Sequence, residues 1–491
     1  MRRVLVAAST IAIFQLPTAL VSSVDYTIGS SVVASPAVSP LPDPCPAQAE
    51  NPPGQVNYKD TEVEPQVAVN PTDPNNVIGV FQEDRWSDGA AHGLVAAVSF
   101  DGGHTFINNW AEFSACSDNP ATAFAEPLPR ATDPWVSFDA AGRAYQIALP
   151  IIDGQLNGSA VTASYSTDKG LTWSTPVDLT RDFDPTGVIF NDKQSITGDP
   201  YVAGRAYATW IRGNLPGEDV SIAKLGHAFS FRGAPVFSMT NDGGLTWSRP
   251  APMTNANVYA QGNQIAVLPG GVLLDAQAVL FKGSGLQPTP NAVFMAVQRS
   301  TNGGKNWSPA IKIAPLSFVA EEADGQPLRV GDYIPDIAVD RRSGAAYMTW
   351  ADSRGGTTNK IVLSASVDGG KTWSSPVVVS HHDEAQSFNH AVTVANDGEL
   401  AVLYYDDARN TDSPGIPTDV YLRHSGNGGQ TWSTPQLLYS FDFANAPFAR
   451  GLFLGDYVGL EAIGSSDLIA FFSVTDATPE SANVIAQRLD R

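Results

Sequence analysis

The chain has 491 residues with a formal net charge of -21, and hydrophobic residues make up 43% of it. This acidic balance argues against nucleic acid or an anionic membrane surface as a general partner, because both would repel the chain. The two cysteines, Cys45 and Cys116, exclude a cysteine-rich metal site and leave room for one disulfide.

The start of the chain has the features of a secretory signal peptide. Two arginines are followed by an apolar run that ends near Leu20 and contains Gln15 and Pro17. This run is too short and too polar to predict a membrane span, and small residues follow it at positions 21–23. We therefore expect residues 1–23 to be removed on export, which gives a secreted protein, extracellular or periplasmic, that does not insert into a membrane.

Residues 24–53 are rich in Pro, Ser and Ala, a composition typical of a linker or of a strap over a protein surface. A disulfide between Cys45 and Cys116 would tie this segment to the domain that follows, which we expect to span residues 54–491. Such a length is large for one domain, but a repeat architecture escapes the limit because each unit packs mainly on its neighbours.

One short phrase occurs six times in this domain. The first copy is S-F-D-G-G-H-T-F and the fifth is S-V-D-G-G-K-T-W; the copies occupy residues 99–106, 166–173, 240–247, 300–307, 366–373 and 425–432. Each copy lies between alternating apolar runs, which predicts a turn between two β-strands. The Asp or Asn can accept hydrogen bonds from its own turn, the glycine suits a positive φ, and the last aromatic side chain can pack between sheets. Because two copies have Asn in place of Asp, we interpret the phrase as structural and not catalytic.

A second repeat precedes each phrase and consists of a polar residue, an apolar run, a turn and another apolar run. It occurs seven times, and its last copy ends where a phrase and a fourth strand would follow. Repeats at intervals of roughly 50–75 residues are typical of a propeller. We therefore expect an all-β propeller of four-stranded antiparallel blades, with seven blades favoured and six as the alternative. The segment Val56–Lys59 is expected to close the last blade.

The repeated phrase resembles the Asp-box, or BNR repeat, of the sialidase (neuraminidase) superfamily, and this likeness covers nearly all of the mature chain. The resemblance implies a β-propeller with Asp-box turns and an exo-alpha-sialidase type of activity, in which a glycoside hydrolase releases a terminal acidic sugar. Enzymatic sialidases mostly have six blades, so a count of seven would be a departure. A carbohydrate is the expected partner, and a monomer the expected state.

One face of such a propeller is the expected ligand site. The first strand of each blade lines the channel, so residues near its start converge on the axis at the face opposite the repeated phrase, where a concavity is expected. Several polar residues fall there or in the loops after second strands, namely Arg130, Arg329, Arg450, Glu64, Asp133, Asp84, Arg85, and the tyrosines of two G-D-Y segments, Tyr333 and Tyr457.

The resemblance implies roles for these residues. Sialidases grip the sialic acid carboxylate with three arginines, which here would be Arg130, Arg329 and Arg450, because a guanidinium group binds a carboxylate through two hydrogen bonds. They also use a tyrosine nucleophile, which avoids repelling an anionic substrate. The implied nucleophile is Tyr457, with Tyr333 second; Glu64 is its candidate partner, Asp133 or Asp84 the candidate acid, and Asp84, Arg85 and Tyr333 are candidate substrate contacts.

Two other functions fit the same residues. A non-catalytic propeller could bind glycan or protein through this face, because a fold does not assign a function. A polysaccharide lyase could use a tyrosine or His390 to remove a proton beside a uronate carboxylate held by arginine. No cofactor is expected, and the one candidate ion is a structural calcium among the carboxylates.

Overall fold

The computed structural model of the chain consists of β-strands, with one 3-10 helix, η1 (Phe443–Asn445), among the residues it describes. These are residues 24–42, 45, 54–117, 128–152, 158–183, 189–214, 232–254, 258–282, 293–331, 333–354, 356–411 and 413–491. The expected signal peptide, 1–23, lies outside them, as does most of 43–53. No helix in these ranges is long and apolar enough to cross a bilayer.

The strands form antiparallel units of four, in which strands adjacent in sequence are also paired in space. Six units follow the chain directly: β2 (Asn57–Val69), β3 (Val77–Trp86), β4 (Ala91–Ser99), β5 (Ile107–Asn109); β6 (Arg130–Phe138), β7 (Ala144–Ile151), β8 (Gly158–Ser166), β9 (Val177–Phe183); β10 (Ile189–Gly198), β11 (Ala206–Asn214), β12 (Arg232–Thr240), β13 (Ala251–Pro252); β14 (Val258–Val267), β15 (Leu273–Lys282), β16 (Phe294–Ser300), β17 (Ile311–Pro315); β20 (Asp336–Val339), β21 (Ala346–Asp352), β22 (Lys360–Ser366), β23 (Val377–Val378); and β24 (Ser387–Val394), β25 (Leu400–Asp406), β26 (Pro417–Ser425), β27 (Gln436–Asp442).

The remaining strands form two further sheets. One contains β29 (Gly459–Ile463), β30 (Asp467–Val474), β31 (Asn483–Asp490) and β1 (Thr27–Val33). The other is small and contains β18 (Glu322–Ala323), β19 (Gln326–Arg329) and β28 (Leu452–Phe453). In this small sheet β19 and β28 run parallel, with Arg329 opposite Phe453.

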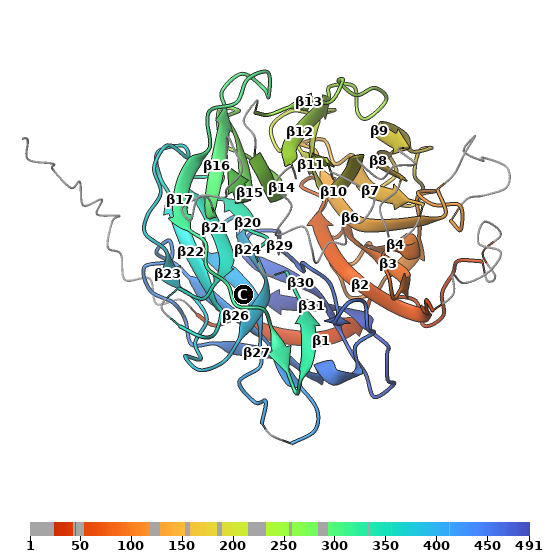
Figure 1. Cartoon of the computed structure of the whole chain (residues 1–491). Coiled ribbons are helices and arrows are strands. Elements are labelled where there is room, and N and C mark those ends of the chain that lie inside the picture. Colours follow the sequence, from red (N-terminus) through yellow and green to blue (C-terminus); the bar gives the residue numbers. More distant parts are fainter. Residues whose placement is uncertain are drawn as a thin grey trace, which may run out of the picture.

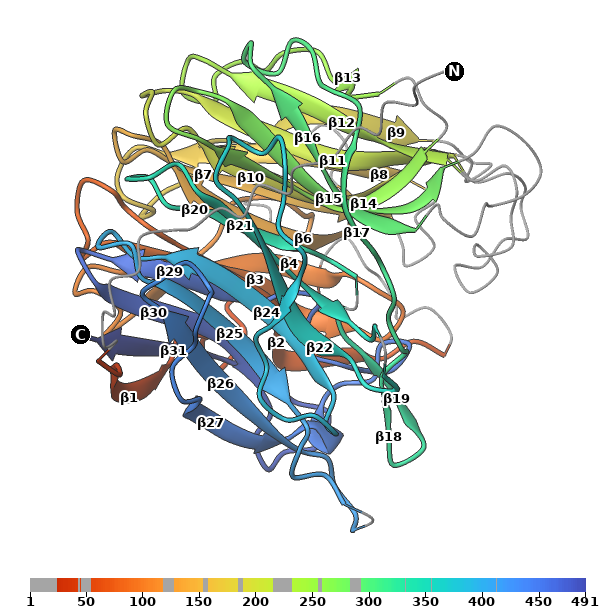
Figure 2. The same ribbon diagram turned by 90° about the vertical axis from the view of Figure 1, so that its left-hand side faces the viewer.

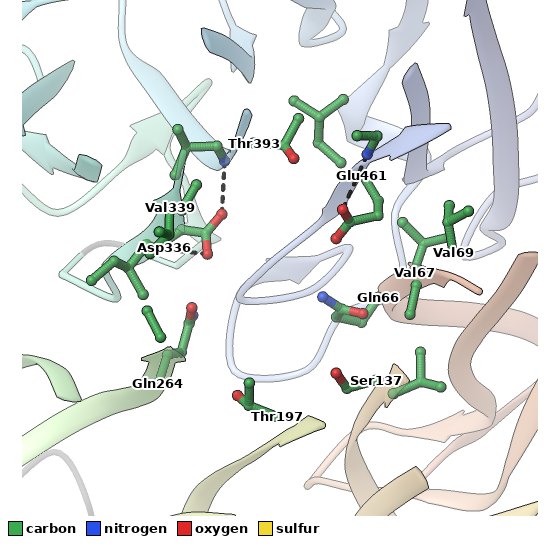
Figure 3. Close-up of a pocket in the computed structure, with 18 of the residues that line it drawn as sticks. Gln66, Val67, Val69, Ser137, Thr197, Gln264, Asp336, Val339, Thr393 and Glu461 are labelled. Carbon is green, nitrogen blue, oxygen red and sulfur yellow. Dashed lines mark hydrogen bonds between the residues drawn. The ribbon is translucent and has the colours of Figure 1, made fainter. Parts of the chain in front are cut away.

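The four-strand units are arranged around a common centre (Figure 1). A cavity of about 400 Å³ lies there and is lined by the first strand of every unit. Figure 3 shows this lining, to which β2, β6, β10, β14, β20, β24 and β29 contribute Gln66, Ser137, Thr197, Gln264, Asp336, Thr393 and Glu461. The architecture is therefore all-β and propeller-like, with apolar clusters packed between neighbouring units.

The fourth strand of the last unit differs from the sequence-based expectation. It is β1, which pairs antiparallel with β31, and the two lie side by side in Figure 2. The predicted closing segment, Val56–Lys59, instead leads into β2, the first strand of its own unit. The sequence did not predict β1, which falls in the expected linker, because most of its residues are exposed and do not alternate between apolar and polar. An edge strand can be held by backbone hydrogen bonds alone, and such bonds do not require an apolar sequence pattern.

The expected disulfide between Cys45 and Cys116 is present, with Cα atoms 5.1 Å apart. It joins the segment before β2 to the segment after β5. The expected strap is therefore held to the chain at two places, by β1 on β31 and by this disulfide.

The repeated phrase folds into the same turn in each copy. In the first, the Ser99 hydroxyl donates to Asp101 Oδ1 at 2.7 Å, and the backbone N–H groups of Gly103 and Thr105 donate to Ser99 Oγ and Asp101 Oδ1 at 2.9 Å each. In the fourth copy Asn302 accepts equivalent bonds through its amide oxygen. The negative charge is therefore not needed, which supports a structural interpretation of the phrase.

Candidate functional site

The first strands carry an irregularity at equivalent places. Glu64, Asp133, Lys193 and Asn389 have φ values of 56°, 53°, 50° and 40°, and each lies where the pairing register with the next strand shifts. A left-handed conformation costs a residue with a side chain about 1–3 kcal/mol, and such strain clusters at functional sites. Bulges of this kind re-aim side chains.

Lys193 is the centre of a buried ion cluster. Its Nζ donates to Asp456 Oδ2 and lies 3.7 Å from both Glu64 Oε1 and Asp133 Oδ2. The Lys193 side chain is 12% exposed and that of Glu64 is 1% exposed. Burial opposes the charge on Lys193, but Asp133, Asp456 and Glu64 outweigh it and raise its pKa well above the usual value. These three acids are therefore held together by one shared cation.

The carboxyl groups of this cluster differ in their protonation. Burial and the charge of Asp133 raise the pKa of Glu64 to about 8, although Lys193 opposes the shift. Burial also disfavours the charge of Asp456, but Lys193 and Arg329 prevail and lower its pKa. Near neutral pH, Glu64 is thus mostly protonated while Asp456 is ionised, which gives one proton donor and one fixed negative charge in the same site.

Three arginines lie beside this cluster. The guanidinium carbons of Arg85 and Arg329 are 4.6 and 4.1 Å from the ring centre of Phe453. Arg329 Nη2 donates to Asp456 Oδ2 at 3.3 Å, and Arg329 and burial both lower the pKa of Arg450. Arg450 is exposed, has a φ of 65°, and makes no hydrogen bond or ion pair with any residue in the described part of the chain. It is the cation of this group that remains available to an anionic ligand.

Asn389 joins the two G-D-Y segments. Its Nδ2 donates to the Gly455 carbonyl and its Oδ1 accepts from the Gly331 N–H, both at 2.9 Å. The segments pack so closely that a Cβ on Gly331 would overlap the Asp456 carbonyl oxygen. This contact fixes the backbone that carries Asp456.

Replacing Gly331 with alanine is expected to lower the free energy of unfolding by about 1–3 kcal/mol, because the added methyl group meets backbone that cannot move aside. Gly356 is the matched control, since its added Cβ would have no neighbour closer than 3.8 Å. Denaturant titration of both variants measures the difference. Equal stability of the two variants would contradict the close packing of the G-D-Y segments.

The structure separates the sequence-predicted residues into groups. Glu64, Asp133, Arg329 and Arg450 come together as described. Arg130 instead donates to Asp88 Oδ1 at 2.7 Å and lies 4.3 Å from the Trp86 ring centre, so it is already paired. Arg85, which the sequence placed among substrate contacts, takes the place beside Arg329 that was expected for Arg130.

The tyrosines and Asp84 occupy other surroundings. The Tyr457 hydroxyl donates to the Pro134 carbonyl at 3.1 Å, and burial raises its pKa well above the usual value. Tyr333 is half-buried and its ring packs 5.3 Å from that of Phe318. Asp84 accepts hydrogen bonds from the Ser39 hydroxyl and from the backbone N–H of Asp60.

Sequence reasoning missed Lys193 and Phe453. Lys193 lies just before Gln194, at the position of the repeat that Glu64 and Asp133 occupy in the first two units. This equivalence was the signal that could have identified Lys193. Phe453 gave no signal, because its role depends on the pairing of β28 with β19.

No protein-family model and no curated protein sequence matches the chain. Among solved structures the chain is similar to a Hadza microbial sialidase, with 15% identity and a TM-score of 0.48 over 84% of this chain and 74% of that one. It is similar to a protein of unknown function from Dyadobacter fermentans (12% identity, TM-score 0.44, 89% and 100% covered). A third is an alpha-L-arabinofuranosidase of Fusarium graminearum (15% identity, TM-score 0.42, 72% and 90% covered). At such identities the role of a side chain does not transfer between proteins.

Proposed function

We propose that the chain is a secreted glycoside hydrolase that releases a terminal acidic sugar in the manner of an exo-alpha-sialidase. The observation that carries this proposal is Arg450, an exposed cation that forms no hydrogen bond or ion pair with a described residue and that lies beside Arg329 and Arg85. Neighbouring arginines repel one another, and a bound anion would offset this repulsion. A sugar carboxylate suits guanidinium groups because it accepts two parallel hydrogen bonds.

Glu64 and Asp133 are the proposed carboxyl groups of the reaction. Glu64 is suited to protonate the leaving oxygen, because it holds its proton near neutral pH. Asp133 has one oxygen, Oδ2, without a hydrogen bond in the described structure, so it can act on a substrate or on a water molecule. The proposed chemistry uses no cofactor.

The test of this function is release of 4-methylumbelliferone from its α-sialoside by the purified mature protein. Turnover that increases with enzyme concentration would support the proposal. A folded protein that releases no fluorophore from this compound, and no sialic acid from sialyllactose, would reject it.

Replacing Glu64 with glutamine is expected to slow hydrolysis of sialyllactose by about a hundredfold, because this substrate needs a protonated leaving group. The aryl sialoside should be much less affected, since its leaving group departs without a proton. If Glu64 had only a structural role, its replacement would slow hydrolysis of both substrates to the same extent. The ratio of the two rates therefore distinguishes a catalytic acid from a structural residue.

The pH profile gives a second measurement of the same residue. Burial, together with the charges of Asp133 and Asp456, raises the pKa of Glu64 to about 8, while Lys193 and Arg85 oppose the shift. The neutral form therefore prevails below pH 8 and the carboxylate above it. Sialyllactose hydrolysis should fall as the pH rises through about 8, and a rate that continues to increase beyond pH 9 would contradict Glu64 as the acid.

Glycan binding without hydrolysis is the second candidate. It is favoured by Tyr457, whose hydroxyl is already bonded to the Pro134 carbonyl and whose pKa is raised, so that this tyrosine is poorly placed to attack a sugar. Saturable binding of sialyllactose without turnover would select this function. The lyase alternative is weaker, because burial lowers the pKa of His390 to about 4, which makes this histidine a weak base.

We also propose that the four-strand units are the seven blades of a propeller closed by β1, and that the protein acts as an exported monomer. The pairing of β1 with β31 supports the closure, and the Cys45–Cys116 disulfide supports an oxidising compartment.

A further inference from the structure

A second group of acidic residues lies on β2 and β3, and none of its members has a role in the hydrolysis proposed above. Glu62 is directly opposite Glu83 in the pairing of the two strands. Carboxylate oxygens of Asp60, Glu83 and Asp84 all lie within 4.8 Å of one another. Glu62 and Glu83 are fully buried, Asp84 is 2% exposed, and Asp60 is exposed. The group therefore extends from the interior of the unit to its surface.

The buried glutamates lack the partners that burial demands. In the described structure neither oxygen of Glu83 and neither oxygen of Glu62 accepts a hydrogen bond of good geometry, and the nearby donors that act on them are the Ser39 and Ser35 hydroxyls. After burial, the largest charges that act on Glu83 are those of Glu62 and Asp84, with a smaller one from Asp60, and all three have the same sign. Buried charges in proteins are paired with an opposite charge or coordinate a metal ion, because an isolated buried charge costs several kcal/mol.

The other two carboxylates are held in place by donors from the N-terminal segment and from β4. The Ser39 hydroxyl and His92 Nδ1 contact Asp84 Oδ2 at 2.7 and 3.1 Å, and the Asp60 N–H donates to Asp84 Oδ1 at 2.9 Å. The Ser39 N–H donates to Asp60 Oδ1 at 2.6 Å. These bonds hold the Asp60 and Asp84 carboxylates near that of Glu83, and no described residue donates a hydrogen bond to Asp60 Oδ2.

We propose that Asp60, Glu83 and Asp84 bind one calcium ion. The ligand atoms are all carboxylate oxygens, the hard donors that Ca²⁺ prefers. Glu62, which faces Glu83, adds negative charge behind the ligands. The ion supplies the opposite charge that the buried glutamates lack.

The proposed ion has a structural consequence. Ser39 bonds to two of the three ligands, so an ion that fixes these ligands also fixes the segment between β1 and β2. The same segment is tied by the Cys45–Cys116 disulfide. Calcium would therefore act as a second clamp that holds the N-terminal segment, and with it β1, on the rest of the fold. This inference is independent of the proposed hydrolase function.

The test is calcium titration of the mature protein after removal of metal with a chelator, by calorimetry and by thermal unfolding. We expect one Ca²⁺ per chain and a midpoint of unfolding that rises with Ca²⁺ concentration, because an ion that binds only the folded state stabilises it. Glu83→Gln should weaken Ca²⁺ affinity about tenfold or more, because affinity at such sites follows the number of charged ligands. This variant keeps the shape of the side chain and removes a buried charge, so its fold should survive.

Two further variants keep the test decisive. Asp60→Asn changes an exposed ligand and should also weaken binding of Ca²⁺. His382→Gln is the matched control, since His381, His382 and Asp406 form a separate group of three possible ligands. Absence of Ca²⁺ binding by the metal-free protein, or equal affinity of Glu83→Gln and the parent, would overturn the proposal, as would loss of Ca²⁺ binding in His382→Gln alone.

Discussion

Replacing Arg450 with alanine is expected to lower kcat/KM for the aryl sialoside by about a hundredfold, while the free energy of unfolding changes little. Arg450 is exposed and makes no hydrogen bond or ion pair with another described residue, so its removal breaks no protein contact. A hydrogen bond between charged groups contributes about 1.5–3 kcal/mol, which corresponds to a factor of roughly 10–150 in rate. Initial rates over a range of substrate concentrations measure the effect.

Two comparisons make the Arg450 result specific. Arg450→Lys should recover only part of the activity, because an ammonium group cannot form the paired hydrogen bonds of a guanidinium group. Arg409→Ala removes another exposed arginine, which pairs with Asp419, and should leave kcat/KM unchanged. An Arg450→Ala protein with the parent's kcat/KM would contradict the arginine grip, and with it the site on this face.

Replacing Lys193 with methionine is expected to lower the free energy of unfolding by about 3–5 kcal/mol, the largest stability effect that we expect in this chain. Lys193 is the shared cation of Glu64, Asp133 and Asp456. Its removal leaves these buried acidic groups without the positive charge that stabilises their ionised forms. Breaking a buried ion pair by removing one partner costs about this amount. Denaturant titration at neutral pH measures the effect.

The pH dependence of the Lys193 variant gives a further check. Asp456 has a lowered pKa because Lys193 and Arg329 favour its charged form, so without Lys193 it will hold its proton to higher pH. The variant should therefore regain part of its stability as the pH falls and the carboxyl groups become neutral. Lys169→Met, which removes an exposed pair with Asp73, is the control and should cost no more than about 1 kcal/mol. A Lys193 variant as stable as this control would contradict the ion cluster.

The repeats made it possible to predict the architecture from the sequence. Alternating apolar runs and the six phrases identify strand pairs and the turns between them, because side-chain alternation and turn chemistry are local properties. The closing strand β1 could not be identified in this way. Its attachment to β31, more than 400 residues later in the chain, depends on backbone hydrogen bonds that any sequence can form.

The residues of the candidate site could be predicted only in part from the sequence. Glu64, Asp133, Arg329 and Arg450 were found because each lies near the start of a repeat unit or of its small neighbouring sheet, where the fold brings residues to the axis. The sequence did not predict that Arg85, and not Arg130, would lie beside Arg329. That outcome depends on which arginine already has a partner. Arg130 contacts Asp88 and Trp86, and no local sequence pattern indicates this contact.

The sequence by itself determined the repeated strand units, the turns that join them and the face on which charged residues gather, since these follow from local patterns that recur along the chain. Only the tertiary structure decided which charges pair. Lys193 contacts Glu64, Asp133 and Asp456, which lie far from it in the sequence, and Phe453 packs against two arginines. The glutamates of β2 and β3 face each other, and no cation in the described part of the chain forms an ion pair with them. The physical reason is that the energy of a charge depends on burial and on neighbours a few ångströms away in space, whatever their separation in the sequence.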